Sequence, residues 1–342
     1  MVVRKRCLAW DWTDTRDCPQ EINNVDFDGP MHSVSNWNVW EPPELKGRAA
    51  FRPMIHLQPE LEGEEWQTLL KSDADIVHYF NEPERNGISS DLAAQKWHEQ
   101  VVPQLRKLHH KKLVSPSCAG DDAGVAWLKD FMNKVKDEPP DFVGVHYYGT
   151  SSSDAKKFLH KIHDEYPKQK LIVSEIASIS RKKQNVYAFT RNMANWMDQT
   201  DWIFEYTFFG CLKTMPDDFV SPQARLMSQQ GKFTKLMKLL MHEQPITKAH
   251  KEKAQAGDKD GDAKGKAHES GGKAPDEGHQ HDQHDKNNKG GHDNEQDEPD
   301  DDDPEPKPKH HKGNGTKSGG DGKEGSKSEQ GAEKPGQPMV SA

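Results

Sequence analysis

Two glutamates directly follow apolar runs in this sequence, and carboxyl groups in such places can carry out acid–base chemistry. Glu82 follows the run that ends at Phe80, in the sequence Asn81-Glu82-Pro83. Glu175 follows Ile172-Val173-Ser174. Glycoside hydrolysis uses such a pair: one carboxyl group donates a proton to the leaving oxygen, and the other attacks C1 or activates water. The two glutamates are therefore our candidate catalytic residues.

The neighbours of Glu82 favour this interpretation. Pro83 restricts the backbone next to the carboxylate, and Asn81 can form a hydrogen bond to a sugar hydroxyl group. For either glutamate alone, a carboxylate that caps a helix is an alternative interpretation. The occurrence of both after predicted strands favours a catalytic pair.

The elements that must position the two glutamates alternate between short apolar runs and amphipathic segments. We predict eight strands, at residues 6–12, 33–40, 50–56, 75–80, 112–117, 141–148, 170–174 and 201–209. Most are continuous apolar runs, which is typical of a parallel sheet covered on both faces. Predicted helices lie at residues 91–109, 121–136, 153–166, 183–199 and 232–242, and Pro103 should kink or interrupt the first of these.

This alternation predicts an α/β fold with right-handed crossovers. Eight strands favour closure into a (β/α)8 TIM barrel, in which the active site forms at the carboxyl ends of the strands. Both glutamates lie at such ends, after predicted strands four and seven. The first and second helices should be short, because residues 13–32 and 41–49 are short and rich in Pro, Asp and Asn.

Composition divides the 342 residues into two parts. All aromatic residues precede residue 246, and the only Val, Ile, Leu or Met residues after 245 are Ile246, Met339 and Val340. Such a stretch cannot bury enough apolar surface to offset the entropy of ordering it. We therefore predict one catalytic domain over residues 1–245 and a disordered, charged, His-rich tail over residues 246–342. Metal capture by the tail histidines is a weaker alternative.

Charge and motif content exclude several classes of function. The net charge is −9, with both parts acidic, so the sequence lacks the basic footprint of a nucleic-acid-binding protein. The sequence contains no run of 18 apolar residues, so it predicts no membrane span. The basic N-terminus is not followed by the apolar segment of a secretory signal. The four cysteines have no metal-site spacing and are expected to be free, although a Cys18–Cys211 disulfide stays open. We expect a monomer without metal or cofactor.

The strand-end motifs resemble those of glycoside hydrolase family 128, a family of fungal and bacterial β-1,3-glucanases within the clan of retaining (β/α)8 glycosidases. Beside Asn81-Glu82-Pro83 and Ser174-Glu175, the resemblance rests on motifs of the other strands and of the closing turn. These are Arg6–Trp10, Asn36-Trp37, Phe51–Ile55, His146–Gly149, Tyr206–Gly210 and Leu226–Gly231. The resemblance covers roughly residues 4–242 and leaves out the tail.

The resemblance implies a role for each matching position. Glu82 corresponds to the general acid/base and Glu175 to the nucleophile. Tyr148 corresponds to a tyrosine that holds the nucleophile by a hydrogen bond. Further candidate substrate-binding residues are Asn81, His146, Trp37, Phe208 and Tyr206. The implied function is a retaining endo-β-1,3-glucanase that binds β-1,3-glucan polysaccharide or oligosaccharide outside the cell or in the cell wall.

Four positions depart from the family pattern and leave alternatives open. Tyr147 and Phe208 stand where the family usually has Trp, His56 stands where it has an aromatic residue, and Glu84 stands where it commonly has Asp. Fewer stacking faces would weaken or reshape sugar subsites. One alternative is therefore a β-glucan- or oligosaccharide-binding protein with attenuated hydrolysis, and another is hydrolysis of a different β-glycan. Endo or exo action and the preferred chain length stay open.

Overall fold

The computed structural model describes residues 2–247. The predicted tail, apart from its first two residues, lies outside the described residues. The strands are β1 (Arg6–Ala9), β2 (Met31–Ser35), β3 (Ala50–Arg52), β4 (Met54–Ile55), β5 (Ile76–Tyr79), β6 (Lys112–Leu113), β7 (Phe142–Gly149), β8 (Lys170–Ser178) and β9 (Ile203–Phe208).

These strands form a ring of parallel neighbours. Six pair in the order β3-β2-β1-β9-β8-β7 and three in the order β4-β5-β6. Pro53, which has no N–H to donate, separates β3 from β4, so the two are halves of the third predicted strand. Parallel bridges from Val114 to Phe142 and from Cys118 to Val145 connect the chain after β6 to β7. The predicted (β/α)8 barrel is confirmed.

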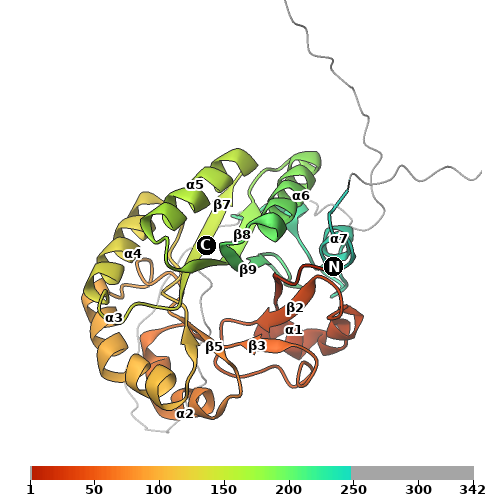
Figure 1. Ribbon diagram of the computed structural model, residues 1–342. Helices are drawn as coiled ribbons and strands as arrows, with labels where there is room; N and C mark the ends of the chain where they lie inside the picture. The colour runs from red at the N-terminus through yellow and green to blue at the C-terminus, as the bar shows by residue number, and fades with distance from the viewer. Residues whose placement is uncertain (1, 248–342) are drawn as a thin grey trace, which may run out of the picture. The chain divides into compact units, whose positions relative to one another are not determined.

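Helices form the outer ring around the strands (Figure 1). They are α1 (Trp12–Asp17), α2 (Gly63–Lys71), α3 (Ser90–Lys96), η3 (Trp97–Leu108), α4 (Asp122–Lys134), α5 (Ser152–Glu165), α6 (Lys183–Gln199) and α7 (Lys235–His242), with short 3-10 helices at η1 (Pro19–Asn24), η2 (Gln58–Leu61) and η4 (Pro222–Ala224). As predicted, α1 is short. Between β2 and β3 the described chain forms turns only.

Two helical features differ from the sequence prediction. Helix α2, which buries Trp66 and Leu69, was not predicted. The helix that contains Pro103 is not interrupted there; it changes at Trp97 from α to the wider π spacing of η3, with Pro103 inside. In a π-helix the N–H of a residue donates to the carbonyl oxygen five residues earlier, instead of four as in an α-helix. Pro103 has no N–H, so one hydrogen bond of the π-helix is missing at that residue.

Side chains fill the inside of the barrel in layers below the strand ends. A small apolar cluster of Ile76, Val114, Phe142 and Ile172 comes from β5, the chain just after β6, β7 and β8. Phe204, the extra residue at an irregularity in the β8–β9 pairing, packs against it. A buried polar group also joins the inner faces of three strands: Arg52 Nε lies 3.2 Å from both carboxylate oxygens of Glu205, and Ser33 Oγ donates to Glu205 Oε2 at 2.8 Å.

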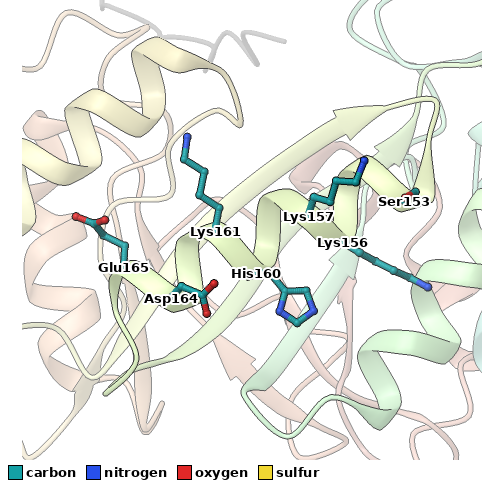
Figure 2. Close-up of a pocket in the computed structure, with 7 residues that line it drawn as sticks. All are labelled: Ser153, Lys156, Lys157, His160, Lys161, Asp164 and Glu165. Atoms are coloured by element: carbon teal, nitrogen blue, oxygen red, sulfur yellow. The ribbon is translucent and has the colours of Figure 1, made fainter.

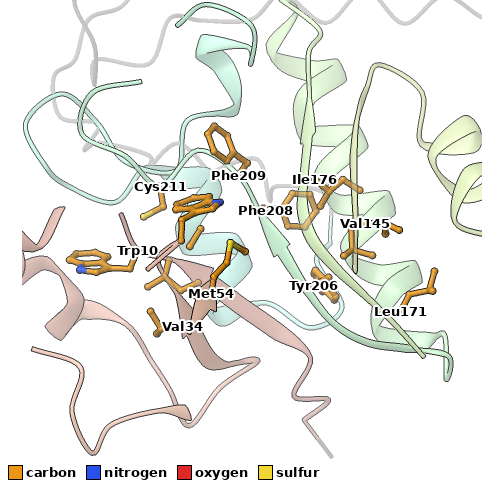
Figure 3. Close-up of a cluster of buried hydrophobic side chains, with 14 of the residues drawn as sticks. Trp10, Val34, Met54, Val145, Leu171, Ile176, Tyr206, Phe208, Phe209 and Cys211 are labelled. Atoms are coloured by element: carbon orange, nitrogen blue, oxygen red, sulfur yellow. The ribbon is translucent and has the colours of Figure 1, made fainter. Parts of the chain in front are cut away.

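A larger apolar core surrounds the strands and underlies the helices, and Figure 3 shows part of it. All four cysteines are free and buried, as expected, so the pairing of Cys18 with Cys211 does not occur. Cys18 Sγ instead lies 3.6 Å from Met227 Sδ. Within residues 2–247, no helix is long and apolar enough to cross a membrane.

Candidate active site

Glu82 stands on a strained turn at the carboxyl end of β5. Phe80 and Glu82 have φ angles of 42° and 41°, and Trp37, in the turn after β2, has a φ of 54°. These are three of the four non-glycine residues of the described chain with positive φ. Such conformations cost about 1–3 kcal/mol and persist where the surrounding structure imposes them. Here the Glu82 N–H donates to the carbonyl oxygen of Ser117 at 2.9 Å, which secures the turn.

Glu175 lies within β8, and two neutral donors hold its carboxylate. The Trp37 indole Nε1–H donates to Glu175 Oε1 at 2.7 Å, and the Tyr148 hydroxyl group donates to Oε2. Trp37 comes from the turn after β2 and Tyr148 from β7, so the barrel brings the three residues together. Donors directed at both oxygens favour the ionised form of a carboxyl group.

His146 lies between the two carboxyl groups and is completely buried. Its Nδ1 is 2.8 Å from Glu82 Oε1, and its Nε2 is 3.6 Å from Glu175 Oε1. An irregularity between Val145 and His146 in the β7–β8 pairing sets His146 opposite Glu175. Both glutamates therefore contact opposite nitrogens of one imidazole ring.

The electrostatics of this group follow from its burial. Burial raises the pKa of Glu175 above its ordinary value, against the opposing effects of the His146 charge and the Tyr148 and Trp37 donors. Burial lowers the pKa of His146, but the charges of Glu175 and Glu82 outweigh it, and the net direction is upward. A proton on His146 is therefore stabilised between the two carboxylates.

Several polar atoms around the pair have no hydrogen-bond partner within the described chain, although they are buried. They are Asn81 Oδ1, Glu82 Oε2, His146 Nε2 and His56 Nδ1. Burial lowers the pKa of His56 to about 4, so its imidazole is neutral near pH 7. Buried polar groups are nearly always paired in native proteins. A ligand with many hydroxyl groups would supply the missing partners.

Sequence reasoning missed Arg85, which reaches Glu82 from the more open side. Arg85 Nε lies 3.3 Å from Glu82 Oε2, and its Nη2 donates to Asp121 Oδ2 at 2.7 Å. Its position three residues after Glu82, on the turn that Pro83 begins, was the available signal.

Tyr206 and Phe208 do not join this group. The Tyr206 hydroxyl group donates to Asp198 Oδ1 at 2.7 Å and accepts from Arg6 Nε at 2.9 Å. Phe208 pairs in register with Leu8 and Ile176, and Figure 3 shows it beside Ile176. Both side chains are buried and belong to the packing outside the barrel strands, so their prediction as sugar contacts is corrected here.

The aromatic ring that lies at the site is that of Phe209, the residue directly after β9. Its ring centre lies 5.8 Å from that of Trp37 and 6.0 Å from that of Tyr148, both in edge-to-face geometry. Side chains of a strand alternate between its faces, so a shift of one residue exchanges the inner face for the outer. The inward-facing Glu205 was the signal for this register, because it places Tyr206 and Phe208 on the opposite face.

Two of the positions that depart from the family pattern have structural roles. Tyr147 packs against Phe158 of α5, with 5.4 Å between ring centres, and so faces away from the carboxylates. Glu84 Oε1 accepts a hydrogen bond from the Ala119 N–H at 2.8 Å, and burial raises the pKa of Glu84. Glu84 thus joins the turn after β5 to the segment that precedes α4.

A hollow of about 660 Å³ lies elsewhere, along the outer side of α5 (Figure 2). Lys156, Lys157, His160 and Lys161 line it together with acidic neighbours, and all come from one helix. None of them contacts Glu82 or Glu175 in the described structure, so we do not place the active site there. No group of three or more His, Cys, Asp or Glu side chains within residues 2–247 could hold a metal ion.

Comparison with known proteins shows the family of the chain. A family model described as a glycosyl hydrolase catalytic core matches residues 8–239. A crystal structure of an exo-β-1,3-glucanase of family 128, subgroup VI, from Aureobasidium namibiae is 51% identical, with a TM-score of 0.71. That match covers 72% of this chain and 99% of the other. The chain belongs to glycoside hydrolase family 128.

Two further family 128 structures are more distant. A subgroup V exo-β-1,3-glucanase from Cryptococcus neoformans is 26% identical, with a TM-score of 0.57 and coverage of 70% of this chain and 100% of the other. A subgroup VII oligosaccharide-binding protein from the same organism is 15% identical, with a TM-score of 0.55 and coverage of 70% and 93%. The latter likeness shows the fold alone. None of the curated proteins searched matches the chain.

Proposed function

We propose that this protein is a retaining β-1,3-glucanase in which Glu82 is the general acid/base and Glu175 the nucleophile. The observation that carries the proposal is the arrangement of two buried carboxyl groups around one imidazole, at the ends of the fourth and seventh barrel strands. Retaining glycosidases need the carboxyl groups about 5–5.5 Å apart. The proposal therefore requires the Glu82 and Glu175 carboxyl groups to stand this close to each other when the substrate is bound.

The surroundings of each glutamate support its role. Glu175 receives two neutral donors, which favour the ionised form that a nucleophile needs. Glu82 has one oxygen at His146, and its other oxygen, Oε2, has no hydrogen-bond partner and faces Arg85 Nε at 3.3 Å, so we propose that Oε2 is the oxygen that meets the glycosidic oxygen. Glu82 then donates its proton to the leaving oxygen while Glu175 attacks C1, and a covalent glycosyl–enzyme forms.

In the second half-reaction Glu82 acts as a base. It removes a proton from water, which attacks C1 and displaces Glu175, so that two inversions give net retention. His146 contacts both carboxyl groups and can stabilise whichever of them carries the negative charge at each stage. Asn81 and Trp37 border the same space and are proposed as contacts of the reacting sugar.

We propose exo action. The sequence resemblance predicts endo action, but the two structures of the family that share 51% and 26% identity with this chain are both exo-β-1,3-glucanases. The same assay tests both modes: an exo enzyme releases one small product from laminarin from the earliest times, whereas an endo enzyme first produces a range of oligosaccharides.

Hydrolysis of laminaritetraose, followed by proton NMR, tests the proposed function. We expect the first product to carry the β-anomeric configuration before mutarotation. Initial formation of the α-anomer would contradict the retaining mechanism. A panel of other β-glycans tests the alternative substrates.

The alternative of a binding protein was predicted from replaced family aromatics at positions 56, 147 and 208, and of these only His56 lies beside the proposed site. A chain that binds laminari-oligosaccharides but releases no reducing ends at micromolar protein would favour it. We also propose a location outside the cell or in the cell wall, where a polymeric glucan would be met. Recovery of the native protein in the cytosol would contradict that location.

A further inference from the structure

Phe219 is an exposed aromatic side chain beside the proposed nucleophile. It lies in the segment between β9 and η4 and is 41% exposed. Only Val2 and Leu108 are other large hydrophobic residues with comparable exposure in the described chain. A single exposed apolar side chain is common on protein surfaces, and what distinguishes Phe219 is its contact with a residue that holds Glu175.

The loop that carries Phe219 is held in place on both sides of it. Arg181, from the segment between β8 and α6, donates to the carbonyl oxygens of Asp218 and, at 3.1 Å, of Val220. The Phe219 N–H donates to Asp217 Oδ1 at 2.8 Å. Val220 is itself buried. The exposed ring is therefore presented by a secured loop.

The ring of Phe219 is connected to the catalytic group through Tyr148. The centres of these two rings are 5.2 Å apart, in edge-to-face geometry, and the Tyr148 hydroxyl group holds Glu175 Oε2. The contacts run in the series Glu82, His146, Glu175, Tyr148, Phe219. Phe219 follows β9 and Glu82 follows β5, and these strands lie on opposite sides of the ring, so the two residues come from opposite sides of the barrel.

We infer that Phe219 stacks against the glycone sugar, the unit whose C1 is attacked, and is a specificity-determining residue of the reaction. This inference rests on the proposed function. A flat apolar ring suits the C–H face of a β-glucosyl unit, in which all the ring substituents are equatorial. Phe219 thus supplies a ring for stacking on one side of the barrel, whereas the family's aromatic residue at position 56 is replaced by His56.

The test compares Phe219→Ala, Phe219→Leu and Phe219→Trp on two substrates, laminaritetraose and 4-nitrophenyl β-glucoside. The aryl glucoside has a glycone sugar but no leaving sugar. We expect Phe219→Ala and Phe219→Leu to raise KM about 3–10-fold for both substrates, with little change in kcat, because both variants lose the flat ring that packs on the sugar. Phe219→Trp should restore KM. Leu108→Ala, at a 69% exposed position on η3, is the matched control and should change neither constant.

Three outcomes would overturn the inference. An unchanged KM in Phe219→Ala would show that the ring does not bind sugar. A rise for laminaritetraose alone would place it on the leaving-group side. A fall in kcat that Phe219→Leu reverses would show that the side chain only supports Tyr148. A wild-type protein that hydrolyses neither substrate would instead contradict the proposed function.

Discussion

At the scale of single residues, the donors to Glu175 are the groups whose loss should be easiest to detect. The nucleophile must be ionised, so the acid limb of kcat/KM falls as pH drops through its pKa, which burial raises above 4.5. Tyr148→Phe removes a donor that favours the ionised form. We expect the acid limb to move to higher pH and kcat to fall about 10–100-fold, the range for a hydrogen bond to a charged group.

Trp37→Phe is the companion variant, because it removes the second donor while it keeps an aromatic ring. It should move the acid limb in the same direction. The pH dependence of kcat/KM, measured on an aryl β-glucoside, checks both variants. An acid limb that stays in place or moves to lower pH in both would contradict the assigned role of these donors.

The proposed catalytic pair could be selected from single residues, because a carboxylate after an apolar strand has few structural uses. The contact of His146 with both glutamates was less accessible, because it depends on an irregularity in the β7–β8 pairing. The exchange of Phe208 for Phe209 has a related cause: two adjacent phenylalanines satisfy the same apolar pattern, and only the strand register distinguishes them. Phe219 could not be placed because its loop has no periodic pattern.

At the scale of elements, the network around Tyr206 joins β1, β9, α6 and the chain after α7. Arg6 donates to the Tyr206 hydroxyl group, to Asp198 Oδ2 at 2.7 Å and to the carbonyl oxygens of Leu240 and Glu243. Tyr206→Phe removes a buried partner of both Arg6 and Asp198. We expect it to lower the free energy of unfolding by about 1–3 kcal/mol.

The same variant separates structural from sugar-binding roles. Because Tyr206 does not reach the carboxylates, KM and kcat for laminaritetraose should stay close to wild type below the unfolding transition. Thermal unfolding monitored by circular dichroism, together with steady-state kinetics, checks this. A raised KM with an unchanged Tm would show that Tyr206 does contact the sugar.

The order of the strands and the major helices could be predicted from the alternation of apolar runs and amphipathic segments. The assignment of a barrel requires only the approximate bounds of each strand and helix. Helix α2 was missed because its apolar residues occupy a single short stretch around Trp66 between acidic residues. The π spacing of η3 could not be predicted from Pro103 alone, because a proline is equally compatible with a kink or an end.

At the scale of the whole molecule, residues 2–247 contain the complete ring of strands, and the 51% identical relative is matched over 99% of its own length by 72% of this chain. Truncation after Thr247 should therefore leave Tm and specific activity on soluble laminarin nearly unchanged. Calorimetry and a reducing-sugar assay check this. A loss of activity confined to insoluble glucan would show that the remaining residues contact the polymer.

The central claim, that Glu82 is the acid/base and Glu175 the nucleophile, is tested most directly by azide rescue of Glu82→Ala and Glu175→Ala on an activated aryl β-glucoside. In Glu82→Ala the glycosyl–enzyme still forms and azide displaces it, so two inversions should give the β-glucosyl azide. In Glu175→Ala azide attacks the substrate itself, and one inversion should give the α-glucosyl azide. Proton NMR distinguishes the anomers, and the reverse pair of products, or near wild-type turnover without azide in both variants, would contradict the assignment.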